Sequence, residues 1–289
     1  MKCAVLGGDE RAAALALQLR EAGHSVRCYG LEKSEYAGKL PQTGCLQGCL
    51  YGADWVLLPV PAEREGFLNA PLAVQRLAMP ELLAALWPGQ MLCGGGFAPE
   101  TSLAAVRAGL TVFDLLRRRD FSVGNAAVTA EGAVSLLMEH SRRCLWGSRV
   151  LVTGWGRIAS QLAPRLRALG ATVTVAARKA GDRAAAEALG HRAVCFAELP
   201  SCASDFDFAV NTVPAPVLGR DSLEAMRPDV LLLELASAPG FDREAAEDMG
   251  LRSLAAPGLP GRYAPETAAR IYLDTVDTII REREESDGD

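Results

Sequence analysis

The stretch VLVTGWGRIASQ, residues 150–161, has the pattern of a turn that holds the pyrophosphate of a dinucleotide. Gly154, Gly156 and Ala159 match G-x-G-x-x-[GA], directly after the apolar run 149–153 and directly before a helical pattern. Gly154 allows the tight turn, Gly156 lets backbone N–H groups approach phosphate, and the small Ala159 lets helix and strand pack closely. The stretch therefore predicts a dinucleotide-binding strand–turn–helix unit halfway along the chain.

The helix after this turn should begin at Arg157 and Ile158. Its first N–H groups have no acceptor inside the helix, so they and the helix dipole favour a phosphate at that end. Both residues are therefore candidates for contact with the cofactor. The alternative is a tight turn that binds no ligand. Pro164 falls inside the predicted helix and should kink it.

A related stretch, CAVLGGDERAAA, opens the chain at residues 3–14. It supplies Gly7 and Gly8, but Asp9 stands where the second glycine of the fingerprint belongs. A carboxylate there would repel a pyrophosphate. We therefore expect an amino-terminal domain without nucleotide, which serves the substrate or acts as a lid.

Short apolar runs alternate with helical patterns along all 289 residues, which is typical of parallel sheets covered by helices. The fold class expected is α/β, with two Rossmann-like, doubly wound parallel-sheet domains joined by an interdomain helix. The domains expected are an amino-terminal α/β domain at 1–124, the interdomain helix at 125–144, an NADP-binding Rossmann domain at 145–264, a helix at 265–282 that packs back on the first domain, and a flexible tail at 283–289.

The apolar runs also place the strands. They are expected near residues 3–7, 25–29, 55–59, 91–93, 111–113, 149–153, 172–176, 193–196, 208–211, 230–235 and 252–255.

The charge balance argues against nucleic-acid and membrane partners. The formal net charge is −5, the pI is near 5.4, and the basic run at 117–119 is short. Apolar runs such as 230–236 are far shorter than the roughly 20 residues of a membrane span, and charges at 9–11 interrupt any secretory pattern. We expect a cytoplasmic protein whose partners are small molecules or proteins.

The eight cysteines are irregularly spaced, so neither a disulfide framework nor a metal site is expected. Cys45 and Cys49 are the one close pair, and without a nearby histidine they make a poor zinc half-site. All eight are interpreted as buried, reduced thiols.

The kind of dinucleotide is decided about 20 residues after the glycines, where an acid would bind the ribose 2′-hydroxyl of NAD. Here the strand TVTVAA runs into Arg178 and Lys179, and Asp182 comes several residues too late. A guanidinium and an ammonium would attract a 2′-phosphate, which favours NADP. A solvated basic pair at a strand end is the alternative.

The three histidines have structural interpretations. His24 and His191 lie in helix-to-strand turns at the wrong end of their sheets, and His140 ends the interdomain helix. The layout resembles the D-2-hydroxyacid dehydrogenases, whose chemistry needs an arginine after the fifth nucleotide-domain strand and a histidine near the end. The corresponding stretch ELASAPGF, residues 234–241, has Ser237 and no arginine, and no histidine follows His191. That activity is therefore disfavoured.

Polar and turn-forming residues follow the later strands of the nucleotide domain. Asn211, Thr212 and Pro214 follow the fourth strand, Ser237 follows the fifth, and Gly258 follows the sixth. The carboxyl ends of parallel strands share one edge of the sheet, so we expect these loops to face the nicotinamide. Simple turns are the alternative. Asn211, Thr212, Pro214 and Gly258 are cofactor-binding candidates.

The motifs together resemble the family of the dipicolinate synthase A subunit over nearly the whole chain. The stretches that carry the resemblance are AVLGGDERAAALALQLREAGHSV, FDLLRRRDFSVGNAAVTAEGA, VLVTGWGRIASQLAPRLRALGATVTVAARK, VNTVP, LASAPG and APGLPGRYAPETA. Four residues depart from the family pattern: Val128 replaces a proline, Glu234 an aspartate and Glu266 a lysine, and Pro164 interrupts a helix.

The resemblance implies an NADP-dependent dehydrogenase that acts on a CH–CH bond during bacterial sporulation. Its substrate would be a small cyclic dicarboxylate, either a hydroxytetrahydrodipicolinate or the dihydro form, and its product pyridine-2,6-dicarboxylate. The family further implies a separately encoded partner, the flavoprotein-like dipicolinate synthase B subunit, and a place in the cytoplasm of the mother cell. Homo-oligomers are left open. A non-catalytic NADP-binding scaffold or sensor is the rival interpretation.

The site residues follow from this expected reaction. Arg118 is the candidate for a substrate carboxylate, because a guanidinium offers two parallel donors, and a solvated arginine is the alternative. Thr129 and Ser237 are further substrate-binding candidates. Asn125 and Glu131 are the catalytic candidates, Asn125 as a hydrogen-bond donor and Glu131 as the acceptor of the ring proton. Helix capping is the alternative for Glu131.

Overall fold

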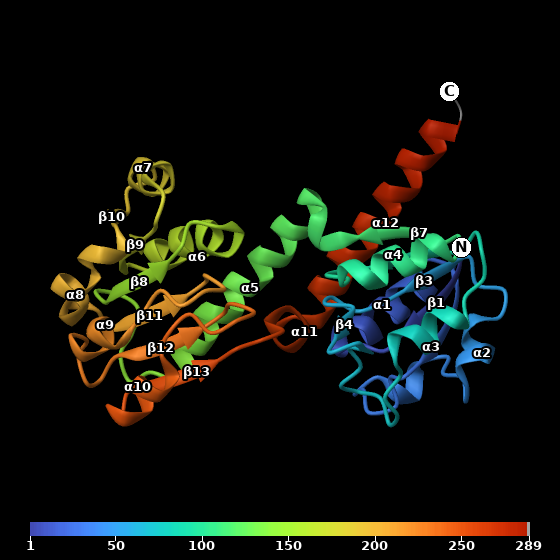
Figure 1. Cartoon of the computed structure of the whole chain (residues 1–289), viewed down its shortest axis with the longest axis horizontal. Helices are drawn as coiled ribbons and strands as arrows, with labels where there is room; N and C mark the ends of the chain where they lie inside the picture. The colour runs from blue at the N-terminus through green and yellow to red at the C-terminus, as the bar shows by residue number, and fades with distance from the viewer. Residues whose placement is uncertain (288–289) are drawn as a thin grey trace. The chain divides into compact units, whose positions relative to one another are not determined.

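The computed structural model describes residues 1–287, and the chain forms two compact units. Unit 1 comprises residues 1–125 and the carboxy-terminal segment from Pro260 onward, and unit 2 comprises residues 126–259. Each unit is a parallel sheet with helices on both faces (Figure 1). The division places the carboxy-terminal segment with the amino-terminal sheet.

The sheet of unit 1 has the strand order β2-β1-β3-β6-β7, and all its neighbouring strands are parallel. Its strands are β1 (Lys2–Leu6), β2 (Ser25–Tyr29), β3 (Trp55–Leu57), β6 (Met91–Gly94) and β7 (Thr111–Asp114). The helices and 3-10 turns within this unit are α1 (Glu10–Glu21), η1 (Ala37–Lys39), α2 (Leu46–Leu50), α3 (Met79–Ala84), α4 (Pro99–Arg107), η2 (Leu115–Arg117) and α12 (Pro265–Asp287). This order reverses direction between β1 and β3, which is the switch point where open α/β sheets bind ligands.

A short hairpin that the sequence analysis missed follows β3. Strands β4 (Glu63–Arg64) and β5 (Phe67–Leu68) pair antiparallel around Glu65 and Gly66, both of which have positive φ. Two residues with positive φ make the tight hairpin turn, and strands of two residues leave no periodicity for a sequence pattern to reveal.

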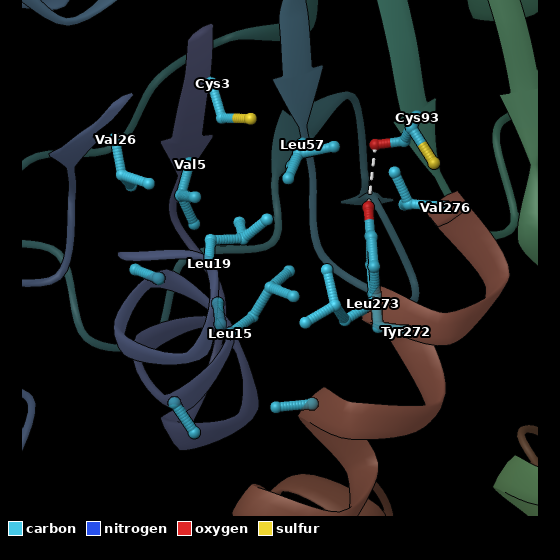
Figure 2. Packing of buried hydrophobic residues seen from close by; sticks show 14 of the residues in the cluster. Cys3, Val5, Leu15, Leu19, Val26, Leu57, Cys93, Tyr272, Leu273 and Val276 are labelled. Carbon is cyan, nitrogen blue, oxygen red and sulfur yellow. Dashed lines mark hydrogen bonds between the residues drawn. The ribbon is translucent and has the colours of Figure 1, made fainter. Parts of the chain in front are cut away.

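The core of unit 1 joins the two ends of the chain. Leu15 and Leu19 of α1 and Leu273 of α12 pack beside one another against the sheet (Figure 2). The single O–H of the buried Tyr272 is shared between the carbonyls of Leu58 (3.0 Å) and Cys93 (2.9 Å). Burial raises the pKa of Tyr272 well above its ordinary value. Because α12 continues to Asp287, residues 283–287 are helical rather than a flexible tail, and residues 288–289 lie outside the described part.

The sheet of unit 2 has the strand order β10-β9-β8-β11-β12-β13, again all parallel. Its strands are β8 (Arg149–Thr153), β9 (Thr172–Ala176), β10 (Arg192–Val194), β11 (Phe208–Asn211), β12 (Leu231–Glu234) and β13 (Arg252–Ala255). Its helices and turns are α6 (Arg157–Ala168), α7 (Ala180–Ala188), η3 (Phe196–Glu198), α8 (Leu199–Cys202), η4 (Ala203–Asp205), α9 (Arg220–Glu224) and α10 (Arg243–Asp248). This is the dinucleotide-binding order, with its switch point between β8 and β11. The α/β fold class with two doubly wound sheets is confirmed.

The helix expected at 125–144 is α5 (Arg119–Glu139), which begins and ends earlier. The sequence analysis missed this early start because Gly124 is a poor helix former. A Cβ at Gly124 would lie 2.9 Å from Cγ2 of Ile271, so glycine lets α5 and α12 pack closely. Helix α5 is long and apolar enough to span a membrane, but half of its apolar window is buried and its residues enter the cores of the protein. A short helix, α11 (Leu259–Tyr263), precedes α12.

Candidate functional site

Gly154 closes the turn after β8 in a conformation that only glycine adopts easily. Its φ is +81°, and its N–H donates to the carbonyl of Ala176 at 2.7 Å. A Cβ here would lie 2.7 Å from Cγ2 of Val213 and 3.2 Å from Oγ1 of Thr212. Left-handed backbone and close packing together require glycine.

Gly156 is a glycine for a different reason. Its φ of −87° and ψ of −168° suit any residue, and a Cβ would meet no described atom within 4 Å. Neither backbone strain nor packing explains why this residue is a glycine. The remaining explanation is the open space beside it, which a side chain would enter. Helix α6 begins here without a side-chain cap, and Ala159 is fully buried between helix and sheet. Open space at Gly156 therefore lies beside the uncapped N–H groups at the start of α6, as a pyrophosphate site requires.

The amino-terminal copy of the turn is filled by the protein itself. A Cβ at Gly7 would lie 2.7 Å from Cβ of Ala70 and 2.9 Å from Cδ2 of Leu68. The Asp9 carboxylate accepts a hydrogen bond from the Arg11 N–H at 3.1 Å, and so caps α1. Neither space nor uncapped helix end is available to a phosphate. These contacts give a physical reason for the nucleotide-free interpretation of this turn.

A cavity of about 850 Å³ lies beside the second turn, entirely within unit 2. Its lining residues are Gly154, Trp155, Gly156, Ala177, Arg178, Lys179, Asp182, Phe196, Thr212, Val213, Pro214, Ala215, Pro216 and Val217. The structure thus brings together Gly154, Gly156, Arg178, Lys179, Thr212 and Pro214 from the sequence analysis. Arg157, Ile158, Ser237 and Gly258 are not among the lining residues.

The end of β9 gives this cavity a positive wall. Arg178 and Lys179 are exposed, and α7 begins just after them without a side-chain cap. Arg183 fixes the backbone, since its Nη1 donates to the carbonyls of Ala177 and Arg178, both at 2.9 Å. Asp182 lies in the first turn of α7 and also lines the cavity. The sequence analysis excluded Asp182 because it lies several residues beyond the strand end. The first turn of α7 nevertheless places it at the cavity.

The sequence analysis missed the apolar lining. Trp155 was skipped because it fills a variable position between the two glycines, and Phe196 follows a strand whose end was placed too late. Flat or apolar side chains are what a cofactor ring packs against, but single apolar residues carry no recognisable sequence signal.

Asn211 holds the strand ends together at the switch point. Its side chain is fully buried, and its Nδ2 donates to Glu234 Oε1 at 2.6 Å and to the Val213 carbonyl at 2.9 Å. Its Oδ1 accepts a hydrogen bond from the Thr153 hydroxyl. Glu234, also buried, accepts the N–H of Gly240 at 2.7 Å. The Asn211 side chain positions the loop that lines the cavity and does not itself line it.

The candidates for chemistry are divided between the units. Thr129, Glu131 and Ser237 lie in unit 2, with Thr129 buried and the other two exposed. The Glu131 carboxylate is 3.5 Å from Arg165, which holds it at the surface of α5. In unit 1, Asn125 Oδ1 accepts a hydrogen bond from Arg11 Nη1 at 3.0 Å.

Arg118 is already bound to protein carboxylates. Its guanidinium contacts Asp120 at 2.7 Å and Glu282 at 2.8 Å, the second from the far end of the chain. These hydrogen bonds lower the pKa of both carboxyls, and they raise the pKa of Arg118. A substrate carboxylate would have to displace them.

The histidines lie as expected in turns. His24 Nδ1 is 3.2 Å from the terminal amine of Met1, and the buried His191 packs on Trp155 with ring centroids 5.8 Å apart. Burial lowers the pKa of both imidazoles. Their ring contacts are structural in both cases.

The cysteines differ in part from the expectation. Burial raises the pKa of Cys28 and Cys49 to about 12, but Cys45 and Cys144 are exposed, so not all eight thiols are buried. These two lie in loop segments outside the apolar runs. Within residues 1–287, no group of three or more metal-ligating side chains is present.

Comparisons with known proteins agree with this division. Residues 2–116 match the family model of the N-terminal domain of the dipicolinate synthase A subunit. Residues 115–249 match that of the D-isomer specific 2-hydroxyacid dehydrogenase NAD binding domain. A nicotinamide dinucleotide is therefore the cofactor class of unit 2.

Full-length relatives are found by sequence and by structure. The chain is 29% identical to the dipicolinate synthase A subunit of Bacillus subtilis (strain 168), covering 100% of this chain and 98% of that one. The crystal structure of the Bacillus subtilis A chain matches with a TM-score of 0.82 at 29% identity, covering 99% and 97% of the two chains. The crystal structure of the A subunit from Bacillus halodurans matches with a TM-score of 0.81 at 25% identity, covering 96% and 97%. The resemblance predicted from the sequence is confirmed: along its whole length, this chain is a relative of the dipicolinate synthase A subunit.

Proposed function

We propose that this chain is the NADP-dependent subunit of a dipicolinate synthase, which oxidises a cyclic dicarboxylate to pyridine-2,6-dicarboxylate. The observation that carries the proposal is the open turn at Gly156, where glycine is explained by neither strain nor packing. It stands in a chain related over its full length to the dipicolinate synthase A subunit. An oxidoreductase role follows from that relationship and from the dehydrogenase-type domain of unit 2.

NADP is proposed over NAD because of the charge at the end of β9. Arg178 and Lys179 line the cavity where an NAD enzyme would place an acid for the ribose 2′-hydroxyl. A 2′-phosphate carries about −1.5 to −2 charges at neutral pH, and a guanidinium binds it through paired hydrogen bonds. Asp182 lies at the same wall and would favour the unphosphorylated ribose, so the basic pair must outweigh it.

In the proposed reaction, the dihydro substrate loses one hydride and one proton. Bound NADP⁺ supplies the hydride acceptor. The ring loses a proton in the same conversion and becomes aromatic, which gives dipicolinate, NADPH and H⁺. A hydroxytetrahydro substrate would first lose water. Glu131 is the proposed proton acceptor, with Thr129 and Ser237 as hydrogen-bond donors to the substrate.

The partner is proposed from the name of the relatives, and the setting from the family resemblance stated for the sequence. A protein named as one lettered subunit implies a second chain, and we propose the flavoprotein-like B subunit of dipicolinate synthase as that partner. We further propose that the complex works in the cytoplasm of the mother cell during sporulation.

The test is an activity assay of the purified chain, alone and with the B subunit. NADP⁺ and the cyclic substrate are supplied, NADPH is followed by absorbance, and dipicolinate is quantified by chromatography. We expect one dipicolinate for each NADPH, with loss of the product in Gly156→Asp. If the complex makes dipicolinate equally well with Gly156→Asp, the chain is a scaffold whose nucleotide turn is dispensable.

A further inference from the structure

Arg11, in the first turn of α1, carries a nearly buried guanidinium. Its side chain is 5% exposed. Nη2 donates to the carbonyl of Val60 at 2.5 Å, and Nη1 donates to Oδ1 of Asn125 at 3.0 Å. Within the described residues 1–287, Nε makes no hydrogen bond. Because an arginine side chain has five N–H groups, this guanidinium has N–H donors left with which to bind a ligand.

The charge of this guanidinium is only partly balanced. The Asp9 carboxylate lies 3.6 Å away, too long for a hydrogen bond, and its Oδ1 accepts the Arg11 backbone N–H. The other two acceptors are a neutral carbonyl and a neutral amide. A buried charge without a well-bonded partner is costly, and an anion with two parallel acceptors would offset that cost.

The position in the fold is where a ligand is expected. Arg11 follows β1 and Val60 follows β3, so the guanidinium spans the switch point of the β2-β1-β3-β6-β7 sheet. Open α/β sheets bind ligands at this crevice beyond the carboxyl ends of their strands. The glycine turn beside it is packed by Leu68 and Ala70, which removes a nucleotide as the occupant.

We propose that Arg11 binds one carboxylate of the cyclic dicarboxylate substrate through paired hydrogen bonds, with Asn125 holding the guanidinium in place. The proposal rests on the proposed function, since it takes the substrate from there. It also distinguishes Arg11 from Arg118, the arginine that the sequence analysis expected to bind a substrate carboxylate. Arg118 already forms hydrogen bonds with Asp120 and Glu282 through all three guanidinium nitrogens, whereas the Asp9 carboxylate stays 3.6 Å from the guanidinium of Arg11.

The experiment titrates the full chain, loaded with NADPH, by calorimetry with two probes. One probe is pyridine-2,6-dicarboxylate, and the other is pyridine-2-carboxylate, which lacks one carboxylate. We expect the wild type to prefer the dicarboxylate, and we expect this preference to fall about 10- to 150-fold in Arg11→Gln, which is the value of one charge-assisted hydrogen bond. Arg11→Lys keeps the positive charge but lacks the two parallel N–H donors of a guanidinium. It should therefore lose only part of the preference for the dicarboxylate.

The matched control is Arg20→Gln on the same helix, where the exposed side chain donates to the Lys39 carbonyl. It should leave both affinities unchanged. NADPH affinity, which depends on unit 2, reports whether each variant is folded, and Arg11→Lys serves if Arg11→Gln does not fold. A folded Arg11 variant that keeps the wild-type ratio of affinities overturns the carboxylate assignment alone. A wild-type chain that binds neither acid overturns the proposed function together with it.

Discussion

Replacing Gly156 with alanine separates a glycine needed for a ligand from one needed for the fold. The backbone there has φ −87° and ψ −168°, and the new Cβ would meet no described atom within 4 Å. The fold should therefore tolerate the change, and a smaller loss of chain entropy should raise stability by about 0.4–1 kcal/mol. The same methyl group would occupy the space through which a pyrophosphate approaches the start of α6.

The expected loss of affinity follows from the bonds that the methyl group blocks. One charge-assisted hydrogen bond is worth about 1.5–3 kcal/mol, so losing one should weaken NADPH binding about 10- to 150-fold. The assay is a fluorescence titration with NADPH, beside thermal unfolding. Gly219→Ala is the matched control, because Gly219 also starts a helix, with φ −80° and ψ 178°, and meets no described atom within 4 Å. Wild-type NADPH affinity in a stable Gly156→Ala protein would refute the reasoning.

Three further changes test other parts of the account. Arg178→Ala should weaken NADPH binding about 10- to 150-fold and leave NADH binding nearly unchanged; an equal loss for both cofactors, measured by calorimetry, would mean that the basic pair is only a solvated strand end. Tyr272→Phe removes the one buried O–H that the Leu58 and Cys93 carbonyls share, and it should lower the free energy of unfolding by about 1–3 kcal/mol in urea titrations; an unchanged value would mean that this hydrogen bonding contributes nothing net. Arg118→Ala should lower the unfolding temperature at pH 6. Because Arg118 lowers the pKa of Asp120 and Glu282, its contribution is present above the ordinary carboxyl pKa near 4 and is lost as pH falls through the lower folded values. The difference from wild type should therefore shrink between pH 5 and pH 2, and a constant difference would contradict the ion-pair explanation.

The sheets could be predicted from the sequence because buried parallel strands are short, continuous apolar runs. Each expected strand is present, and the largest errors are at the ends, as at β10 (Arg192–Val194), which ends before Phe196. The β4–β5 hairpin escaped because strands of two residues have no period. Helix α5 was expected to start too late, because the reason for Gly124 is Ile271, which lies 147 residues away.

The nucleotide turn was predictable because its chemistry is local. Gly154, Gly156 and Ala159 act through the backbone of their own turn, so spacing alone reveals them. The acid-base and carboxylate-binding candidates depend on residues that are remote in sequence. The sequence predicts Arg118 as an anion site because it does not reveal that Glu282 lies beside it. It gives no sign of the role of Arg11, because the neighbours Val60 and Asn125 come from other segments.

The most direct test of the central claim is hydrogen exchange, measured by mass spectrometry with and without saturating NADPH. The claim is that the turn after β8 holds the nucleotide and the related turn after β1 does not. NADPH should slow amide exchange in peptides that cover residues 154–159 and 177–183, where the uncapped starts of α6 and α7 lie. Slower exchange in residues 7–14, with no change at 154–159 or 177–183, would contradict the account.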